Sequence, residues 1–151
     1  MNNDTVLEYD TFGDPSDPTV LLIMGFTAQM TAWPVELCEQ IAGAGHHVVR
    51  FDNRDCGLSS KTQGDAPNVM EIMMAAMSGQ PVGDVPYSLS DMADDAVAVL
   101  DALGIEQAHV AGASMGGMIT QQMAIDHPTR VASVISIMST TGSPAVGQAD
   151  P

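Results

Sequence analysis

Basic residues are scarce in this sequence of 151 residues. Lys and Arg together number 4, against 19 Asp and Glu, so the formal net charge is −15. A field of this sign repels nucleic acid and anionic membrane surfaces, so neither is an expected partner. The same excess of acid suits a protein adapted to high salt or an ordinary acidic protein, and the charge does not choose between them.

Cysteines, targeting segments and long apolar runs are also few or absent. Neither Cys38 nor Cys56 has a second Cys or His at metal-ligand spacing, and without a secretory signal we expect free thiols. The first ten residues carry acids and no basic-then-apolar run, and no stretch approaches the ~20 apolar residues that span a membrane. These observations favour a cytoplasmic protein with no metal site and no cofactor.

The overall composition is typical of a protein with a compact hydrophobic core. Hydrophobic residues make up 45% of the chain and charged residues 15%, with 14 Gly and 9 Pro, which is typical of a globular protein and not of a disordered one. A chain of this length buries roughly 70% of its unfolded surface as one domain. We therefore treat residues 1–151 as part of a single domain.

Buried strands alternate with helices along the chain. Apolar runs predict strands at 19–24, 47–51, 107–113 and 131–138, and apolar residues at helical spacing predict helices at 33–41, 88–104 and 116–127. Ser88 followed three residues later by Asp91 resembles a capping box at the start of a helix. The alternation indicates an α/β fold, with a mostly parallel sheet and helices on both of its faces.

Two segments lie outside this alternation. Residues 5–9 are expected to form a hairpin with the strand at 19–24. Residues 68–86 form a helical excursion that is dense in methionine, with Met70, Met73, Met74 and Met77 at helical spacing. Such a stripe usually packs against the core, which is the interpretation we favour, although thioethers also suit the flank of a pocket for varied acyl groups.

The chemistry of the chain is concentrated at residues 112–116, which read GASMG. This segment matches G-x-S-x-G between an apolar strand and a helix, the context in which the motif forms a nucleophile elbow. The elbow holds its serine in a strained turn, so the hydroxyl is exposed at the C-terminal edge of the sheet, where such sheets bind ligands. Ser114 is therefore the predicted nucleophile.

Acyl transfer also needs hydrogen-bond donors for the oxyanion that forms on the carbonyl oxygen. An elbow supplies one from the backbone N–H after the nucleophile, here Met115, and the loop after the first buried strand supplies the second. In that loop, the N–H of Phe26 follows Gly25 and is the expected donor. An ordinary turn between strand and helix is an equally weighted interpretation of this loop when its residues are taken alone.

Four motifs follow one another in the chain: LLIMGFTAQMTAWP (21–34), RFDNRDCGLSSK (50–61), YSLSDMADDAVAVLDALGI (87–105) and HVAGASMGGMI (109–119). Together they cover nearly all of it, and they resemble bacterial α/β-hydrolase fold proteins of the aclacinomycin methylesterase type. The resemblance implies a serine hydrolase acting on a small-molecule carboxylic ester, with Ser114 as nucleophile and Phe26 and Met115 as oxyanion donors. Met24 stands where the wider superfamily commonly has a His-Gly pair, a change that leaves the backbone donor available.

The segment 52–59, DNRDCGLS, matches the loop that follows the next strand in this family. We expect its role to be structural, with Arg54 and the neighbouring acids forming ion pairs that support the elbow. Contacts between this loop and the substrate are the alternative.

The acid and the histidine of a catalytic triad follow the serine along the chain in this fold. Only Asp126, His127 and Asp150 do so here. Asp126 and His127 end the helix that leaves the elbow, and about 12 residues at 1.5 Å place them ~18 Å away. Asp150 lies one residue from the C-terminus, with little to hold it in place.

The other three histidines are expected at the far edge of the sheet, because His46, His47 and His109 open strands. All four histidines are therefore interpreted as structural. Residues 139–151 are interpreted as the start of a cap region, and the cap, two further strands, the acid and the histidine are expected beyond them. On this interpretation the chain by itself is a poor catalyst, and its oligomeric state is left open.

Other functions use similar parts. A thioesterase or a cofactor-free haloperoxidase-like enzyme would use the same elbow, whereas a dehalogenase or epoxide hydrolase with an aspartate nucleophile is disfavoured because Ser114 occupies that position. The alternative from a different class is a non-catalytic binding or interaction module that kept the elbow and lost the triad.

Overall fold

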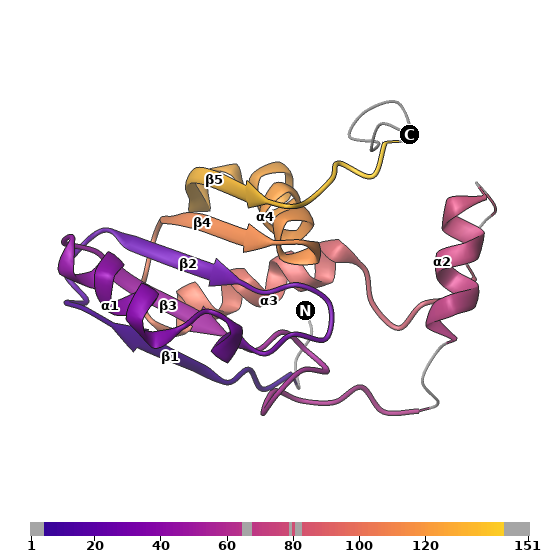
Figure 1. Ribbon diagram of the computed structural model, residues 1–151, viewed down its shortest axis with the longest axis horizontal. Helices are drawn as coiled ribbons and strands as arrows, with labels where there is room; N and C mark the ends of the chain where they lie inside the picture. Colours follow the sequence, from indigo (N-terminus) through magenta and orange to yellow (C-terminus); the bar gives the residue numbers. More distant parts are fainter. Residues whose placement is uncertain (1–4, 65–67, 79, 81–82, 144–151) are drawn as a thin grey trace.

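A five-stranded sheet forms the centre of the part of the chain that the structure describes (Figure 1). The computed structural model describes residues 5–64, 68–78, 80 and 83–143. In spatial order the strands are β1-β3-β2-β4-β5. Their bounds are β1 Tyr9–Phe12, β2 Thr19–Ile23, β3 His47–Phe51, β4 Ala108–Ala113 and β5 Val131–Ile137.

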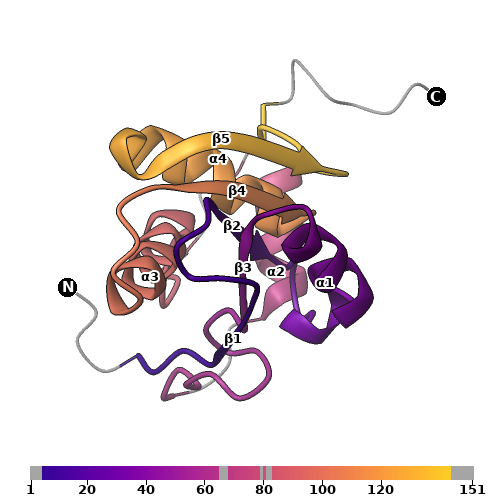
Figure 2. The same ribbon diagram turned by 90° about the vertical axis from the view of Figure 1, so that its left-hand side faces the viewer.

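Helices cover both faces of this sheet, as the sequence predicts (Figure 2). The helices are α1 Val35–Gly43, α2 Val69–Met77, α3 Leu89–Ala102 and α4 Met115–Asp126, with 3-10 turns at Met30–Ala32 and Pro128–Arg130. Helices α3 and α4 pack on one face and α1 packs on the other. Within the described residues, no helix combines the length and the apolar character needed to traverse a bilayer.

Successive residues of β2 enter the cores on opposite faces, because side chains of a strand alternate. Leu21 and Ile23 belong to the core beneath α3 and α4. Leu22, between them, belongs to the core beneath α1. The unbroken apolar run of β2 is therefore that of a strand buried on both faces.

The hairpin expected between residues 5–9 and the strand at 19–24 is not formed. Strand β1 pairs antiparallel with β3 instead, with Tyr9 opposite Phe51 and Phe12 opposite Val48. The physical reason is that both edges of β2 are occupied, by β3 on one side and by β4 on the other, each in parallel register. Strand β1 therefore lies at the edge of the sheet, next to β3.

The capping box expected at the start of α3 is confirmed. The Ser88 hydroxyl oxygen accepts a hydrogen bond from the Asp91 backbone N–H at 3.3 Å, and the Asp91 carboxylate accepts one from the Ser88 backbone N–H at 2.7 Å. Both donors would otherwise be unpaired at a helix N-terminus. The sequence signal and the local structure therefore agree at this helix.

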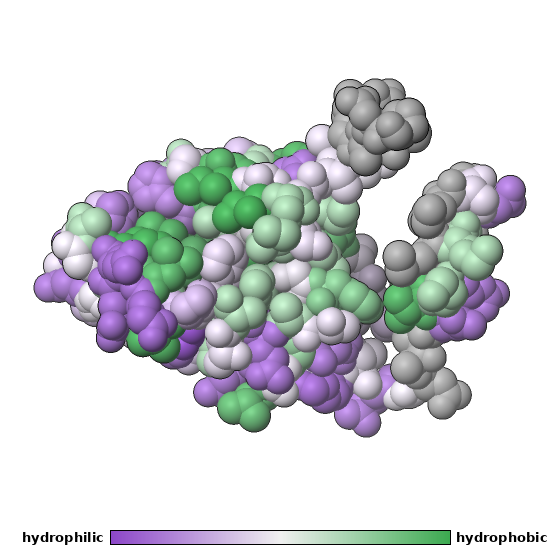
Figure 3. All heavy atoms as spheres, viewed as in Figure 1, coloured by the Kyte–Doolittle hydropathy of each residue, from purple (hydrophilic) through white to green (hydrophobic). Residues whose placement is uncertain are grey.

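Helix α2 stands apart from the sheet, beyond the ends toward which β2 and β4 point (Figure 1). Met70 is 66% exposed and Met74 is 65% exposed, so the expectation that the methionine stripe packs against the core is wrong for these two residues. The side chains of Met73 and Met77 lie outside the described part. Because this helix does not lie against the sheet, Met70 and Met74 cannot pack into either core of the sheet. Figure 3 shows hydrophobic residues of the helix exposed to solvent.

Candidate active site

Ser114 is the residue that joins β4 to α4. Its backbone has φ 55° and ψ −121°, in a region that non-glycine residues rarely adopt. The end of the edge strand holds this turn, since the Ser114 N–H donates to the carbonyl of Ile137 at 2.9 Å. The side chain is exposed, so the strained turn presents the hydroxyl to solvent at the C-terminal end of β4.

The two glycines of the G-x-S-x-G segment allow backbone segments to meet. A Cβ atom on Gly112 would lie 2.1 Å from the carbonyl oxygen of Gly116. A Cβ atom on Gly116 would lie 2.2 Å from the carbonyl oxygen of Ile23, at the end of β2. Because backbone atoms cannot give way as flexible side chains do, a side chain at either position would force β2, β4 and α4 apart.

The loop of residues 24–30, which follows β2, lies directly against the elbow. A Cβ atom on Gly25 would be 3.0 Å from the Ser114 Cβ and 3.5 Å from the Met115 backbone nitrogen. Phe26 follows Gly25, and its side chain is 56% exposed. Among the described residues, no atom accepts a hydrogen bond from the backbone N–H of Phe26 or Met115. Two unpaired backbone donors therefore belong to segments that meet at Ser114.

The residues that follow Ser114 toward the end of α4 are engaged elsewhere. His127 Nε2 lies 2.7 Å from Asp94 Oδ1 on α3. The Asp126 carboxylate accepts hydrogen bonds from the Ser90 hydroxyl at 2.5 Å and from the side-chain amide of Gln122 at 2.8 Å. These contacts tie the end of α4 to α3. Asp150 lies outside the described residues.

The other histidines lie at the strand ends opposite Ser114. His47 begins β3, and its Nδ1 is 3.4 Å from the Thr19 hydroxyl at the start of β2. His109 Nδ1 is 2.8 Å from the Ser133 hydroxyl, and its ring centroid is 6.4 Å from that of His46. Within the described part of the chain, no histidine therefore contacts Ser114.

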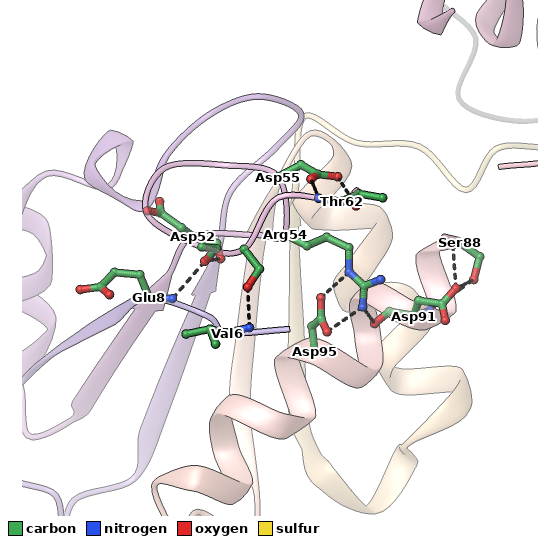
Figure 4. Close-up of polar contacts among 11 residues, drawn as sticks. Val6, Glu8, Asp52, Arg54, Asp55, Thr62, Ser88, Asp91 and Asp95 are labelled. Atoms are coloured by element: carbon green, nitrogen blue, oxygen red, sulfur yellow. Dashed lines mark hydrogen bonds and ion pairs between the residues drawn. The ribbon is translucent and has the colours of Figure 1, made fainter. Parts of the chain in front are cut away.

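The loop after β3, residues 52–60, contains Arg54, which forms an ion pair with Asp95 of α3 (Figure 4). The sequence predicts an ion pair here, but with the acids that neighbour Arg54 in the loop. Arg54 Nε donates to the Asp95 carboxylate at 2.6 Å, and both side chains are more than nine-tenths buried. The guanidinium also lies 4.9 Å from the ring centroid of Tyr87. Burial and the hydrogen bond to Asp55 both raise the pKa of Tyr87. Asp95 lies on α3, and Tyr87 lies just before this helix.

Two residues of the same loop, Asn53 and Asp52, make long-range contacts with the loop that follows β2. The side-chain amide of Asn53 donates to the Met24 carbonyl at 2.8 Å, and the Asp52 carboxylate accepts from the Met30 N–H at 2.7 Å. Both contacts reach the 24–30 loop. They join residues 29 and 22 positions apart, so no local sequence pattern signals them.

Several known proteins are similar in sequence to most of this chain. Rhodomycin D methylesterase DauP from a Streptomyces species is 37% identical over 129 residues, which are 85% of this chain and 37% of that protein. Epoxide hydrolase B from Mycobacterium tuberculosis is 32% identical over 128 residues, which are 85% of this chain and 30% of that protein. The chain thus spans less than two fifths of the length of these curated relatives.

Solved structures have the same fold. An N-acyl homoserine lactone degrading enzyme is 30% identical with a TM-score of 0.70, over 95% of this chain and 48% of that one. The enol-lactonase from Burkholderia xenovorans has a TM-score of 0.72 at 22% identity, over 91% of this chain and 45% of that one, a likeness of fold alone. The model of the alpha/beta hydrolase fold family matches residues 18–150. The chain therefore belongs to the α/β-hydrolase fold family.

Proposed function

We propose that the protein hydrolyses carboxylic esters through an acyl-enzyme formed on Ser114. The observation that carries this proposal is an exposed serine in a strained turn, beside the N–H groups of Phe26 and Met115, which have no acceptor among the described residues. The Ser114 oxygen attacks the ester carbonyl carbon, and the carbonyl oxygen becomes an oxyanion that accepts hydrogen bonds from the N–H groups of Phe26 and Met115. The alcohol leaves, and water then releases the acid.

The proposal includes a histidine base and an acid that lie outside the described residues. A serine hydroxyl needs a base to take its proton as it attacks. The described histidines are engaged at the far end of the sheet or at the end of α4. The relatives are more than twice as long as the aligned segment, which leaves room for such residues in a longer polypeptide.

The relatives favour an ester among acyl substrates. The name methylesterase denotes cleavage of a methyl ester, and a lactone, the substrate class named for the 30% identical structure, is a cyclic ester. The epoxide hydrolase relative favours a different reaction. Ser114 argues against that reaction here, because an epoxide hydrolase of this fold is expected to carry an aspartate at the elbow.

The proposal also assigns α2 to the flank of the substrate pocket. Helix α2 lies beyond the carboxyl ends of the strands, the edge at which sheets of this kind bind ligands (Figure 1). A shallow hollow along this helix is lined in part by Met70, Glu71 and Met74. Flexible thioethers at such a place suit acyl groups of varied shape.

Replacement of the nucleophile tests the proposed function. In the full-length protein, Ser114→Ala should lower kcat for short p-nitrophenyl esters by at least about 10⁴-fold, because no acyl-enzyme can form. It should also abolish covalent labelling by a fluorophosphonate probe. The exposed Ser16 is the matched control, and Ser16→Ala should leave both readouts unchanged.

The same experiment distinguishes the second candidate function, a non-catalytic binding module. That candidate is favoured by the lack of a base beside Ser114 within the described residues. A full-length protein without ester turnover and without labelling would support it. Turnover that survives Ser114→Ala would instead show that ester hydrolysis does not depend on this serine.

A further inference from the structure

The 24–30 loop, whose Phe26 N–H is the second oxyanion donor of the proposed function, has a strained backbone. Thr27 adopts φ 61°, a left-handed conformation that is unfavourable for a β-branched residue. Its internal hydrogen bonds are a turn from the Ala28 N–H to the Gly25 carbonyl at 3.3 Å and one from the Thr27 hydroxyl to the Phe26 carbonyl at 2.7 Å. Such a conformation persists only when surrounding structure holds it.

The surrounding structure that holds it is the 52–60 loop. Asn53 donates to the Met24 carbonyl at the start of the 24–30 loop, and Asp52 accepts from the Met30 N–H at its end. Asn53 is 2% exposed and Asp52 is 3% exposed, so the side-chain ends of these two hydrogen bonds are largely shielded from water.

The 52–60 loop is itself fastened to the rest of the molecule (Figure 4). The Asp52 N–H donates to the Glu8 carbonyl at 2.9 Å, and the Ser59 hydroxyl donates to the Asp52 carbonyl at 2.6 Å. On the other side, Arg54 joins the loop to Asp95 of α3 through two hydrogen bonds, at 2.6 and 2.7 Å. The loop that carries Asn53 and Asp52 is therefore held in place by contacts with the N-terminal segment and with α3.

The carbonyl that Asn53 holds lies at the junction with the elbow. The Met24 carbonyl oxygen is 2.8 Å from where a Cβ atom of Gly116 would lie, and Gly25 comes within 3.0 Å of the Ser114 Cβ by the same measure. The next peptide unit carries the Phe26 N–H. A shift of the Met24 carbonyl would therefore move that N–H relative to Ser114.

We infer that Asn53 is a positioning residue for the oxyanion-stabilising N–H of Phe26, with Asp52 as the second anchor of the same loop. This inference rests on the proposed function of Ser114. Asn53 touches no substrate in this role; its amide fixes the Met24 carbonyl, and the loop places the donor. Loss of one oxyanion donor typically lowers kcat by about 10²–10³-fold. A donor that is misplaced but still present should lower kcat by no more than this.

Asn53→Asp in the full-length protein tests this inference, because it removes the side-chain donor and keeps the size of the residue. We expect kcat for a short p-nitrophenyl ester to fall by about 10–100-fold with KM within about 3-fold, since the donor acts mainly in the transition state. The matching thionoester supplies the second readout, because its thiocarbonyl sulfur accepts hydrogen bonds weakly. Its kcat should fall much less, so the oxoester-to-thionoester rate ratio should drop by at least about 5-fold.

Gln107→Glu is the matched control. It makes the same amide-to-carboxylate change at an exposed residue whose side-chain amide donates to a backbone carbonyl, that of Thr129, at the end of the sheet opposite Ser114. Its kcat and rate ratio should equal those of the unchanged protein. If Asn53→Asp fails to fold, Asp52→Ala serves as the second variant, because it removes the acceptor of the Met30 N–H, and the same drop in the rate ratio is expected.

The outcomes separate this inference from the function on which it rests. If Asn53→Asp, or Asp52→Ala in its place, slows the oxoester and the thionoester equally, or slows neither, the residue has only a structural role and the inference is overturned. Failure of the proposed function would appear elsewhere, as ester turnover that survives Ser114→Ala. Loss of turnover in Ser114→Ala with an unchanged rate ratio in Asn53→Asp would retain the function and reject the positioning role.

Discussion

At the scale of single residues, the site depends on a glycine as much as on its serine. Gly116 lets the first turn of α4 lie against the last carbonyl groups of β2, at positions where a Cβ atom would come within 2.2 Å of the Ile23 oxygen and 2.8 Å of the Met24 oxygen. Both neighbours are backbone atoms. The second is the carbonyl that Asn53 holds, so one small residue sets the distance between the elbow and the 24–30 loop.

Gly116→Ala should therefore destabilise the protein and lower its activity together. Overpacking of this kind costs about 1–3 kcal/mol, which corresponds to a fall in melting temperature of several degrees. Thermal unfolding followed by circular dichroism measures the first effect, and ester turnover measures the second. Gly43→Ala is the matched control, because a Cβ atom on that helical glycine meets nothing within 4 Å, and its melting temperature should stay unchanged or rise slightly. Equal melting temperatures for both variants would contradict the packing argument.

At the scale of elements, α3 joins the site to the body of the molecule. Its side chains enter the core beneath β2, β3 and β4, and its Asp95 pairs with Arg54 of the 52–60 loop. The helix begins with a capping box between Ser88 and Asp91. The hydrogen bonds from the Ser88 hydroxyl and N–H lower the pKa of Asp91 below its ordinary value. A cap of this kind stabilises the first turn of the helix.

Ser88→Ala should lower the free energy of unfolding by about 1 kcal/mol at neutral pH, because the helix loses its N-cap acceptor. The effect should depend on pH with a defined sign. Asp91 has a lowered pKa in the folded protein, so its contribution is present above its unfolded pKa and is lost as pH falls below about 4. The difference in melting temperature between Ser88→Ala and the unchanged protein should shrink from pH 7 to pH 3.

Ser88→Thr is the control for this element, since threonine keeps the hydroxyl and caps nearly as well. It should stay close to the unchanged protein at both pH values. A difference for Ser88→Ala that is constant between pH 7 and pH 3 would show that the Asp91 carboxylate does not take part in the cap.

At the scale of the whole molecule, the nucleophile lies at one end of the sheet and most of the histidines lie at the other. Ser114 follows β4 at its carboxyl end, whereas His47 begins β3 and His109 lies near the start of β4. His127 is held by Asp94 beside α3. In the described residues, Ser114 is therefore without a histidine partner, although the backbone around it has the strained turn that such a serine needs.

Purified residues 1–151 alone should show no fluorophosphonate labelling above a Ser114→Ala control, because an unactivated serine hydroxyl is a weak nucleophile. The full-length protein, labelled in parallel, should react strongly and lose that reaction on Ser114→Ala. Robust labelling of residues 1–151 at Ser114 would mean that these residues contain a base, and it would overturn the assignment of the base to a longer polypeptide.

Local patterns in the sequence were sufficient for most elements and for the elbow. The strands at 47–51 and 107–113 and the helix after Ser88 agree with β3, β4 and α3 to within a few residues. The G-x-S-x-G segment predicts the turn between β4 and α4 that the structure contains at Ser114. These features depend on neighbours a few positions apart, through periodicity, capping and turn sterics, and such neighbours can be read directly from the chain.

The tertiary structure alone decided which distant segments meet. Strand β1 joins β3 because both edges of β2 are filled, and α2 exposes Met70 and Met74 because it lies off the sheet. The contact of Asn53 with the Met24 carbonyl is of the same kind. The sequence by itself determined the elements and the serine at the elbow. The fold determined what holds the backbone beside that serine. The hydrogen-bond partner of Asn53 depends on which strands are neighbours in the sheet, and the burial of apolar side chains along the whole sheet determines that order.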